Sequence, residues 1–412
     1  MDSRERVLRA LSFGQPDRVA VDLGSHRSSG IAAMAYARLR DYLGLPKRLP
    51  RVYDMPQQLA IIDEDVLERF GVDCIELGRA FNEDEADWKP WGLPDGTPCL
   101  IPRWIEPIRD GAHWVIKAAD GTPIAIQKAG VPYFEQLCFP LLEDPRAKLE
   151  RLEDLLQYDM WEALASPPGP TGPNEDRQRY LAEGARRLRE RSSRAIVGLF
   201  GAPLFEGGQQ LMRMDTFYAL LAAEPELAER FLDRLLQLYM CRLESFLDAV
   251  GPYIDIILFS DDYGMQTGPQ ISPQMYRRYF KPRHQQMWSY AKQRAPVKVL
   301  LHSCGSIRAL LPDMIEAGLD AVNPVQISAR GMDPGELKAE LGGRIVFWGG
   351  GCDTQRVLPQ ATPEEVRRHV WHNLDRLAPG GGFVFQQVHN IQSNVPPENI
   401  VAMFDAVAEW RR

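Results

Sequence analysis

Residues 297–324 read VKVLLHSCGSIRALLPDMIEAGLDAVNP, and this stretch contains a complete unit of the predicted fold. Its first part, VKVLLHSC, and its last part, DAVNP, are short runs typical of strands buried on both faces. Between them, RALLPDMIEAGL has the apolar spacing of a helix that packs one face against a sheet. A buried strand, a helix and a second buried strand predict a βαβ unit of a parallel sheet.

Six further runs of the same kind occur outside this stretch: RVAVDLG (18–24), VDCIELG (72–78), RAIVGLFG (194–201), IDIILFSDD (254–262), RIVFWGG (344–350) and GFVFQQ (382–387). With the two runs above they make eight, and helical patterns lie between them, so the sequence predicts an α/β fold, a (β/α)8 TIM barrel. Capping residues and prolines predict helix starts at Ser272, at Thr362 and Pro363, and at Pro396 and Pro397. We expect one barrel domain over residues 1–412, with an insertion at about 80–190.

The expected insertion follows the second predicted strand. Residues 100–130 alternate apolar and polar side chains around the turns RDGA and ADGT, which predicts a β-hairpin that could serve as a lid. Residues 167–173 are rich in proline and glycine and are expected to form an exposed connection.

The composition limits the possible functions. The 412 residues are 45% hydrophobic and 25% charged with a net charge of −8, which is typical of a globular protein and disfavours nucleic-acid binding. We find neither an apolar run of the roughly 20 residues that a membrane span needs nor a secretory signal, so we expect no membrane partner and a cytoplasmic location. Six cysteines without regular spacing argue against a disulfide scaffold.

Polar side chains follow most of the predicted strands, where a barrel carries its catalytic groups. They include Asp261, Asp262, His302, Cys304, Asn323, Cys352, Gln386, Gln387 and His389. Residues at i and i+2 of an extended chain point the same way, so His302 and Cys304 form a pair, and Cys352 leaves an adjacent part of the rim. This predicts a His-Cys-Cys zinc site with an open fourth position. Candidates for a fourth ligand are Asp262, Asp261 and Glu206.

Each of these residues also has a purely structural interpretation. Cysteine is often a small buried hydrophobe, and Cys74, Cys99, Cys138 and Cys241 are interpreted as core or incidental thiols. Asp261 and Asp262 are catalytic candidates that could serve as a metal ligand, a general base or a substrate anchor. In the structural interpretation, one of them caps the next helix and the other is solvated. His389 is a candidate general acid or a residue that hydrogen-bonds the substrate, or else a residue that stabilises its loop. The remaining histidines are interpreted as structural or exposed, with His369 and His372 on a charged helix far from the rim.

Several motifs give the chain a family resemblance. They are SRERVLRALSFGQPDRVAV (3–21), DDYGMQTGPQISPQMYRRYFKPRHQQM (261–287), HSCG (302–305), GGGCDTQRVL (349–358) and VHNIQSNVPPENIVAMFDA (388–406). Over nearly its whole length the chain resembles the uroporphyrinogen decarboxylase superfamily, and within it the cobalamin-dependent methyltransferase branch. The decarboxylases hold substrate carboxylates with an arginine-rich N-terminal motif. In this chain the corresponding residues 22–36, DLGSHRSSGIAAMAY, have Arg27 as their single arginine, which disfavours tetrapyrrole decarboxylation.

The resemblance implies that His302, Cys304 and Cys352 bind zinc. It also implies methyl transfer between a small molecule and the cobalt of a corrinoid, a cobalamin cofactor supplied by a separate partner protein. The small molecule could be a thiol that accepts the methyl group, in which case zinc would bind it as a thiolate. It could instead be a methoxylated or otherwise methylated donor, which zinc would polarise as a Lewis acid. We favour a methylated donor, because the insertion and its tryptophans could enclose an apolar substrate. The rival interpretations are a metal-free uroporphyrinogen-type decarboxylase and a non-catalytic barrel that binds a tetrapyrrole or a corrinoid protein.

Overall fold

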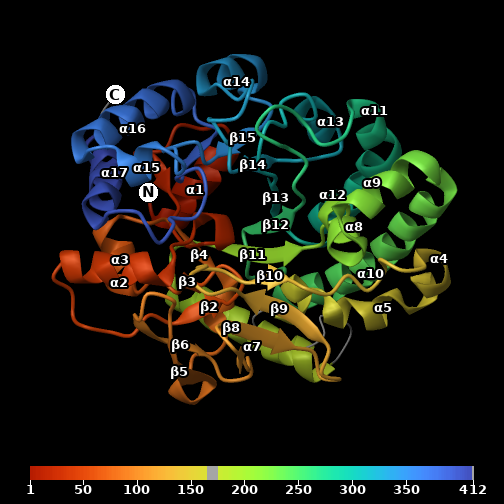
Figure 1. Ribbon diagram of the computed structural model, residues 1–412. Coiled ribbons are helices and arrows are strands. Elements are labelled where there is room, and N and C mark those ends of the chain that lie inside the picture. Colours follow the sequence, from red (N-terminus) through yellow and green to blue (C-terminus); the bar gives the residue numbers. More distant parts are fainter. Residues whose placement is uncertain (165–174, 411–412) are drawn as a thin grey trace.

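The centre of the molecule is an eight-stranded parallel sheet (Figure 1), seen in a computed structural model that describes residues 1–164 and 175–410. In sheet order the strands are β1 (Ala20–Val21), β16 (Phe383–Phe385), β15 (Val346–Trp348), β14 (Ala321–Asn323), β13 (Lys298–His302), β12 (Ile256–Ser260), β11 (Ala195–Gly201) and β4 (Cys74–Glu76). All neighbouring strands are parallel. The eight predicted runs and the predicted barrel class are therefore confirmed.

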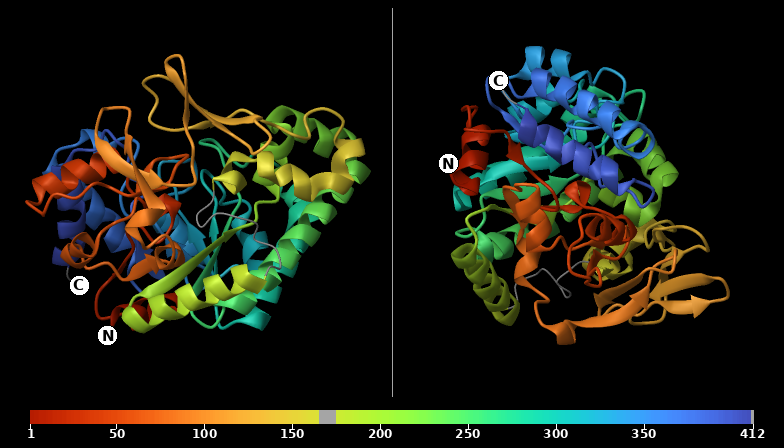
Figure 2. Two further views of the ribbon diagram at one scale, coloured as in Figure 1. Left: turned by 90° about the horizontal axis from the view of Figure 1, so that it is seen from below. Right: turned by 90° about the vertical axis from the view of Figure 1, so that its left-hand side faces the viewer.

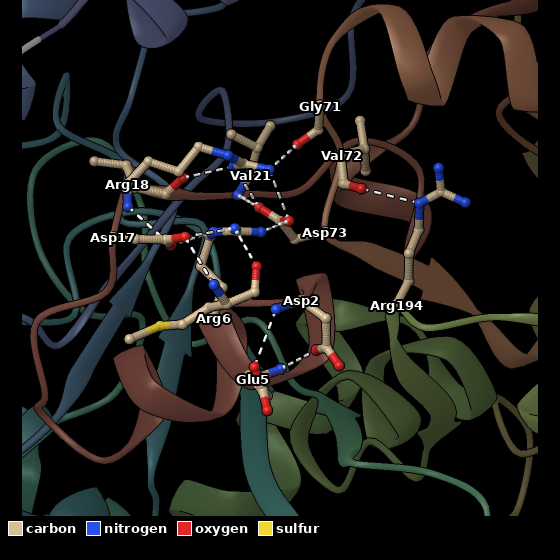
Figure 3. A network of polar contacts seen from close by, with 12 residues as sticks. Asp2, Glu5, Arg6, Asp17, Arg18, Val21, Gly71, Val72, Asp73 and Arg194 are labelled. Carbon is tan, nitrogen blue, oxygen red and sulfur yellow. Dashed lines mark hydrogen bonds and ion pairs between the residues drawn. The ribbon is translucent and has the colours of Figure 1, made fainter.

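The barrel closes between β1 and β4 through a single backbone bond and an ionic cluster. The Asp73 amide donates to the Val21 carbonyl at 2.8 Å, and the Val21 amide donates to the Asp73 carboxylate at 3.0 Å. Arg6 and Arg18 each reach the same carboxylate at 2.7 Å (Figure 3). A buried charge is tolerated only when it is paired and hydrogen-bonded, and here Asp73 satisfies that condition by joining the two strands that the ladder leaves unpaired.

Helices follow the strands and cover the sheet. They are α2 (Ala33–Tyr42) and α3 (Glu64–Arg69) after β1, α8 (Phe205–Met212), α9 (Met214–Ala223) and α10 (Pro225–Val250) after β11, α11 (Pro273–Met275), a π-helical turn at Tyr276–Phe280 and α12 (Lys281–Arg294) after β12, α13 (Leu311–Glu316), α14 (Pro334–Leu341), α15 (Val357–Gln360), α16 (Pro363–Leu377) and α17 (Pro397–Glu409). The predicted starts are confirmed: Thr362 forms a capping box with Glu365, and Ser272 caps α11. No helix in the described ranges is long and apolar enough to cross a membrane.

The N-terminal end of the barrel is sealed by α1 (Ser3–Leu11), whose Val7, Ala10 and Leu11 join the apolar side chains inside the barrel. Inside, the apolar layers include Ala20, Cys74, Leu258, Leu300, Ala321 and Val384. Because side chains alternate along a strand, the inward residues two positions further on are Asp22, Glu76, Ser260, His302, Asn323 and Gln386. The barrel interior therefore changes from apolar to polar at its C-terminal mouth.

A long insertion lies between β4 and β11, and its β-hairpins lie on the side of the molecule away from α1 (Figure 2). A hairpin of β5 (Trp88–Gly92) and β6 (Pro98–Pro102) precedes an antiparallel sheet of β7 (Ile108–Asp110), β8 (His113–Lys117), β9 (Pro123–Gln127) and β10 (Glu135–Gln136). The helices α4 (Pro145–Lys148), α5 (Leu152–Leu155), α6 (Met160–Ala163) and α7 (Glu175–Arg191) complete it. The predicted hairpin is confirmed, with its turns joining β7 to β8 and β8 to β9. The predicted proline-rich connection lies outside the described residues.

A small hairpin of β2 (Val52–Asp54) and β3 (Leu59–Ala60) precedes α3 and was not predicted. Its turn, residues 55–58, meets three other segments. The Phe134 amide, at the end of the insertion, donates to Pro56 O at 2.8 Å, and the Ala33 amide donates to Gln58 O at 2.9 Å. Asn390 Nδ2, in the loop after β16, donates to Gln57 Oε1 at 2.7 Å. This turn therefore ties the insertion to the mouth of the barrel.

Candidate metal and substrate site

Three metal-competent side chains meet at the mouth of the barrel. His302 ends β13, Cys304 follows two residues later, and His389 lies in the loop after β16. One ligand atom of each lies within 4.8 Å of the others, and Cys304 Sγ is 3.4 Å from His302 Nε2. The His302 and His389 rings are 5.6 Å apart between centroids. Imidazole nitrogen with thiolate sulfur is a donor set that zinc accepts, so these residues fit a zinc ion.

The His302 ring is oriented by Asn323 on the neighbouring strand β14. Asn323 Oδ1 is 2.7 Å from His302 Nδ1, while Asn323 Nδ2 donates to Trp348 O at 2.9 Å and to Gln386 Oε1 at 2.8 Å. Because both donor bonds fix the amide, Oδ1 must act as the acceptor, and His302 Nδ1 carries the proton. The lone pair of His302 is therefore on Nε2, on the side of Cys304.

Two of the carboxylates predicted as a fourth ligand lie beside this group. Asp262 Oδ1 is 3.7 Å from His302 Nε2 and accepts from the Cys304 amide at 2.6 Å. Behind it, Glu206 Oε2 accepts from the Asp262 amide at 3.0 Å. Burial, followed by the charges of Asp262 and Asp261, raises the pKa of Glu206 well above its usual value. Asp262 is thus the nearer carboxylate to the histidine nitrogen.

Asp261, the third candidate, is almost fully buried and caps α8. Its carboxylate accepts from the amides of Leu204, Phe205 and Glu206 at 2.8 to 3.1 Å, and from Tyr263 OH at 2.8 Å. A carboxylate at a helix N-terminus satisfies amides that have no partner within the helix. Asp261 therefore fixes the start of α8, which carries Glu206, against the end of β12, which carries Asp262.

Cys352 lies next to this group but is not a member of it. Its thiol is fully buried, with Sγ 3.9 Å from Asp353 O, and its carbonyl accepts from the Val388 amide at 2.8 Å, one residue before His389. A Cβ at Gly351 would lie 2.4 Å from the Phe385 ring, so a glycine is needed for the backbone before Cys352 to pack against that ring. The role of Cys352 as a ligand stays a prediction.

His369 was expected far from the rim, and this expectation is wrong. Its Nε2 accepts from the Asp353 amide at 3.2 Å and so supports the loop of Cys352 from the side of α16. The helical pattern placed His369 on a charged face, but it could not show that the loop after β15 folds back over that helix.

The histidines of the group are neutral near pH 7. Burial lowers the pKa of His302, and burial together with the neighbouring His302 lowers the pKa of His389 to about 4. Burial also raises the pKa of the Cys304 thiol well above its usual value. Neutral imidazoles offer lone pairs to a metal, and a bound cation would favour the Cys304 thiolate. The group therefore has the protonation states from which a metal site can form.

A cavity of about 280 Å³ lies against the turn of the β2–β3 hairpin, whose Gln57 is bonded to Asn390, the residue after His389. It is lined by Ala32, Pro56, Gln57, Pro132, Tyr133, Phe134, Trp161, Gln392 and Ser393. The sequence does not predict this lining, because its residues come from five separate segments and share no local pattern. Of the tryptophans expected to enclose a substrate, Trp91 and Trp114 pack edge to face on each other at 5.0 Å instead.

The sequence profile of the family described as uroporphyrinogen decarboxylase (URO-D) matches residues 142–410, more than half of the chain. The chain belongs to the uroporphyrinogen decarboxylase family. The uroporphyrinogen decarboxylase of Methylococcus capsulatus is 26% identical over 239 residues, which are 56% of this chain and 64% of that one. That of Psychromonas ingrahamii is 26% identical over 248 residues, 57% and 65%. The chain thus matches just under two thirds of the length of these relatives.

Among solved structures, this member of the uroporphyrinogen decarboxylase family is similar to a methyltransferase from Methanosarcina mazei. The TM-score is 0.55 at 19% identity, and the match covers 99% of both chains. At this identity the likeness shows a shared fold. It extends over the whole chain, including the insertion.

The cations at the mouth of this family member are already engaged. Arg27 Nε is 2.5 Å from Asp54 Oδ2, and its guanidinium lies 5.2 Å from the centre of the Trp161 ring. Arg79 donates to the Ile62 carbonyl, and burial lowers its pKa. Glu76 and Asp159 add two more buried carboxyls near Arg27. Among the described residues, neither Arg27 nor Arg79 can therefore reach a substrate carboxylate without first breaking these contacts.

Proposed function

We propose that this protein is a zinc-dependent methyltransferase that moves a methyl group between a small molecule and the cobalt of a corrinoid carried by a separate protein. The observation that carries the proposal is the group of His302, Cys304 and His389 at the barrel mouth, with ligand atoms within 4.8 Å of one another. The likeness in fold to the Methanosarcina mazei methyltransferase supports it. The engaged state of Arg27 and Arg79 supports it over decarboxylation.

His302 and Cys304 would hold the zinc, with Cys352 as the third ligand that the family resemblance implies. When bound, zinc supplies Lewis acidity, which lowers the pKa of a thiol or polarises the leaving oxygen or nitrogen of a methyl donor. Asp262 lies within reach of the fourth position, 3.7 Å from His302 Nε2. A carboxylate there can be exchanged for a substrate, as a catalytic zinc site requires.

His389 is placed to handle a proton. Asn390 donates through Nδ2 to Gln57, so Asn390 Oδ1 faces His389 Nδ1 at 3.0 Å as an acceptor. This leaves the lone pair of His389 on Nε2. With its pKa lowered to about 4, the ring is neutral at pH 7 and can accept a hydrogen bond or a proton from a substrate.

Asp261 and Asn323 act through other residues. Asp261 holds α8 against β12 and so sets the positions of Glu206 and Asp262. Asn323 fixes the tautomer of His302. Partners of this kind contribute substantially to metal affinity, because they orient the ligands before the metal binds.

The decisive experiment is elemental analysis of the purified protein, with His302→Ala and Cys304→Ala as variants. About one zinc per chain, lost in both variants without loss of fold by circular dichroism, is the expected result. Methyl transfer to a reduced corrinoid from methoxylated or methylated compounds, and from a methylated corrinoid to thiols, is then screened. Carefully prepared protein that contains no zinc and binds none would overturn the proposal.

A second candidate function is decarboxylation of a porphyrinogen, which the names of the curated relatives favour. It needs no metal but requires cations for the substrate carboxylates. Arg27 would first have to leave Asp54 and Trp161, to which it is bound. Release of carbon dioxide from uroporphyrinogen by metal-stripped protein would establish this candidate in place of methyl transfer.

A further inference from the structure

We infer that His26, in the loop after β1, binds the sulfur or oxygen atom of the small molecule from which, or to which, the methyl group moves. Its Nε2 would donate a hydrogen bond to that atom. The inference rests on the proposed function, because it names a substrate-binding residue and the class of the reacting atom. It depends on the position of the loop, on buried polar atoms without partners, and on the pairing of His26 with Asp22.

The loop after β1 is bonded to the hydrogen-bond network that orients His302. Gln386 Nε2 donates to the carbonyl and to the hydroxyl of Ser28, both at 3.2 Å. The side-chain oxygen of Gln386 accepts from Asn323, whose own oxygen lies 2.7 Å from His302 Nδ1. One side of the loop is therefore fixed through the same amide groups that fix the ring of His302.

The other side of the loop is paired with the segment that carries His389. The amide of Ile391, two residues after His389, donates to Gly30 O at 2.9 Å, and the Ala32 amide donates to Ile391 O at 2.8 Å. These bonds form a short parallel bridge between the two segments. The loop is therefore held between the segments of His302 and His389.

The ring of His26 interacts electrostatically with both histidines of the site. Burial is the largest cause of the lowered pKa of His302, and the charge of His26 lowers it further. The pKa of His389 is lowered by burial, by His302 and then by His26. Since charges act strongly only over short distances, His26 lies in the same part of the barrel mouth as these two rings.

Two consecutive residues of the loop bury polar atoms that have no hydrogen-bond partner. His26 is 1% exposed and Ser25 is 0% exposed. Neither His26 Nε2 nor Ser25 Oγ forms a hydrogen bond within residues 1–164 and 175–410. Buried polar groups without partners cost free energy and are rare, and they call for a catalytic role, a water molecule or an ion. The loop therefore offers a buried group that a ligand can satisfy.

Asp22 indicates that Nε2 of His26 carries a proton. The Asp22 carboxylate is fully buried and accepts from Trp348 Nε1 at 2.8 Å and from the Ser25 amide at 3.2 Å. Its Oδ2 lies 3.4 Å from His26 Nε2. A carboxylate oxygen beside a ring nitrogen favours the tautomer with the proton on that nitrogen. Catalytic hydrogen bonds are often long before the substrate binds, so Nε2–H is a donor that a ligand can still share.

A donor in this place favours a reacting atom that becomes negatively charged. When a methyl group leaves an ether or a thioether for cobalt, the electron pair of the broken C–O or C–S bond stays on the oxygen or the sulfur. In the opposite direction, a thiol accepts the methyl group as its thiolate. A quaternary amine releases a neutral amine instead and gains nothing from the donor. Donors aimed at developing charge contribute a large part of catalysis in buried sites.

The test is nuclear magnetic resonance of the whole, zinc-bound protein with nitrogen-15 in its histidine rings, without any corrinoid. The chain has seven histidines, and a His26→Gln variant identifies the signal of His26. We expect Nε2 to be protonated and its signal to shift with 2-mercaptoethanol and with dilute trifluoroethanol, but not with trimethylamine. A His26 signal that neither the thiol nor the alcohol changes, or an Nε2 without a proton, would overturn the inference.

The contribution to methyl transfer is tested with matched variants at the same position. His26→Phe keeps a planar ring without a donor, and we expect it to lower kcat for a methyl ether about 100-fold. KM should change little, because the charge develops only after the substrate has bound. His26→Gln keeps a donor and should recover part of kcat, while His372→Gln, at an exposed side chain on α16, should behave like the unmodified protein. Equal kcat in His26→Phe and the unmodified protein would overturn the inference.

The two proposals can fail separately. His26 is not part of the group of His302, Cys304 and His389, so His26→Phe should contain as much zinc as the unmodified protein. Loss of zinc in this variant would make His26 part of the metal site and overturn its assignment to the substrate. A protein that never contains zinc, but whose His26 signal still shifts with the thiol, would reject the proposed function and keep the donor. A zinc protein that transfers methyl groups equally well as His26→Phe would reject the donor alone.

Discussion

Asn323 Oδ1 lies 2.7 Å from His302 Nδ1, and this contact starts a chain of hydrogen bonds across the barrel mouth. Asn323 donates to Gln386, and Gln386 donates to the carbonyl and hydroxyl of Ser28. The chain links β13, β14 and the end of β16 to the segment after β1. The His302 ring is therefore oriented through residues of β14, of the end of β16 and of the segment after β1.

Replacing Asn323 tests this positioning. We expect Asn323→Ala to weaken zinc binding by about 10- to 100-fold, because His302 loses the acceptor that fixes its ring and tautomer. Asn323→Asp keeps an acceptor for His302 and should restore much of the affinity. The measurement is competition with a chromophoric chelator, and thermal melting of both variants reports on the fold. Equal zinc affinity in the Ala variant and the unmodified protein would contradict the role.

The third ligand is decided by comparing Cys352→Ala with His389→Ala. We expect Cys352→Ala to lose zinc while it keeps its fold, because zinc prefers a thiolate and the loop of Cys352 is bonded to the segment of His389. His389→Ala should keep zinc and lose methyl transfer, since His389 then acts on the substrate. Elemental analysis gives the answer directly. The opposite pattern would make His389 the ligand and Cys352 a buried core residue.

The barrel and the pairing of His302 with Cys304 were predictable because their signals are local. Eight buried runs indicated the barrel, polar residues followed most of them, and the spacing of His302 and Cys304 put both side chains on one face of an extended chain. The capping boxes and the turns of the inserted hairpin are equally local. These features depend on residues within a few positions of one another, so the sequence alone contains them.

The cavity and the supporting contacts were not predictable in this way. Gln57 meets Asn390, and Pro56 meets Phe134, only after the insertion and the last loop have docked on the β2–β3 turn. Asp261 illustrates the same limit, because its position after a barrel strand suggests catalysis while its partners are the amides of α8. A pattern along one segment does not specify which other segment satisfies it.

Glu76 predicts a pH dependence of stability. Burial raises its pKa to about 7 in the folded protein, from an ordinary value of 4.5. The folded state therefore binds this proton more tightly than the unfolded state. The contribution of protonated Glu76 to the free energy of unfolding is therefore fully present below a pH of about 4.5 and is lost as the pH rises through about 7. Glu76→Gln, which mimics the protonated form, should raise the free energy of unfolding at pH 8 by about 3 kcal/mol.

At pH 4 the Glu76→Gln variant and the unmodified protein should unfold alike, since both carry a neutral side chain. Urea denaturation at the two pH values measures the difference. The exposed pair of Arg186 and Glu190 supplies a control, because Glu190→Gln should change stability little at either pH. An effect of Glu76→Gln that is the same at pH 4 and pH 8 would show that it arises from packing rather than from ionisation.

We expect Asp73 to stabilise the fold at the end of the barrel opposite the cluster of His302, Cys304 and His389. Its side chain is 0% exposed and joins β1 to β4 through Val21, Arg6 and Arg18 (Figure 3). Asp73→Ala leaves the nearly buried Arg6 with the half-exposed Asp17 as its ionic partner and with the Met1 carbonyl as a further acceptor. Breaking such a pair from one side costs about 3 kcal/mol, which urea denaturation should detect as a lower free energy of unfolding.

The metal content of Asp73→Ala should stay unchanged, because α1 and the apolar layers separate this cluster from His302. The exposed variant Glu190→Ala again serves as the control and should unfold like the unmodified protein. If Asp73→Ala is as stable as this control, the bond from the Asp73 amide to Val21 closes the barrel without the ionic cluster. If it is destabilised and also loses zinc, closure of β1 on β4 is needed to hold the mouth of the barrel in shape.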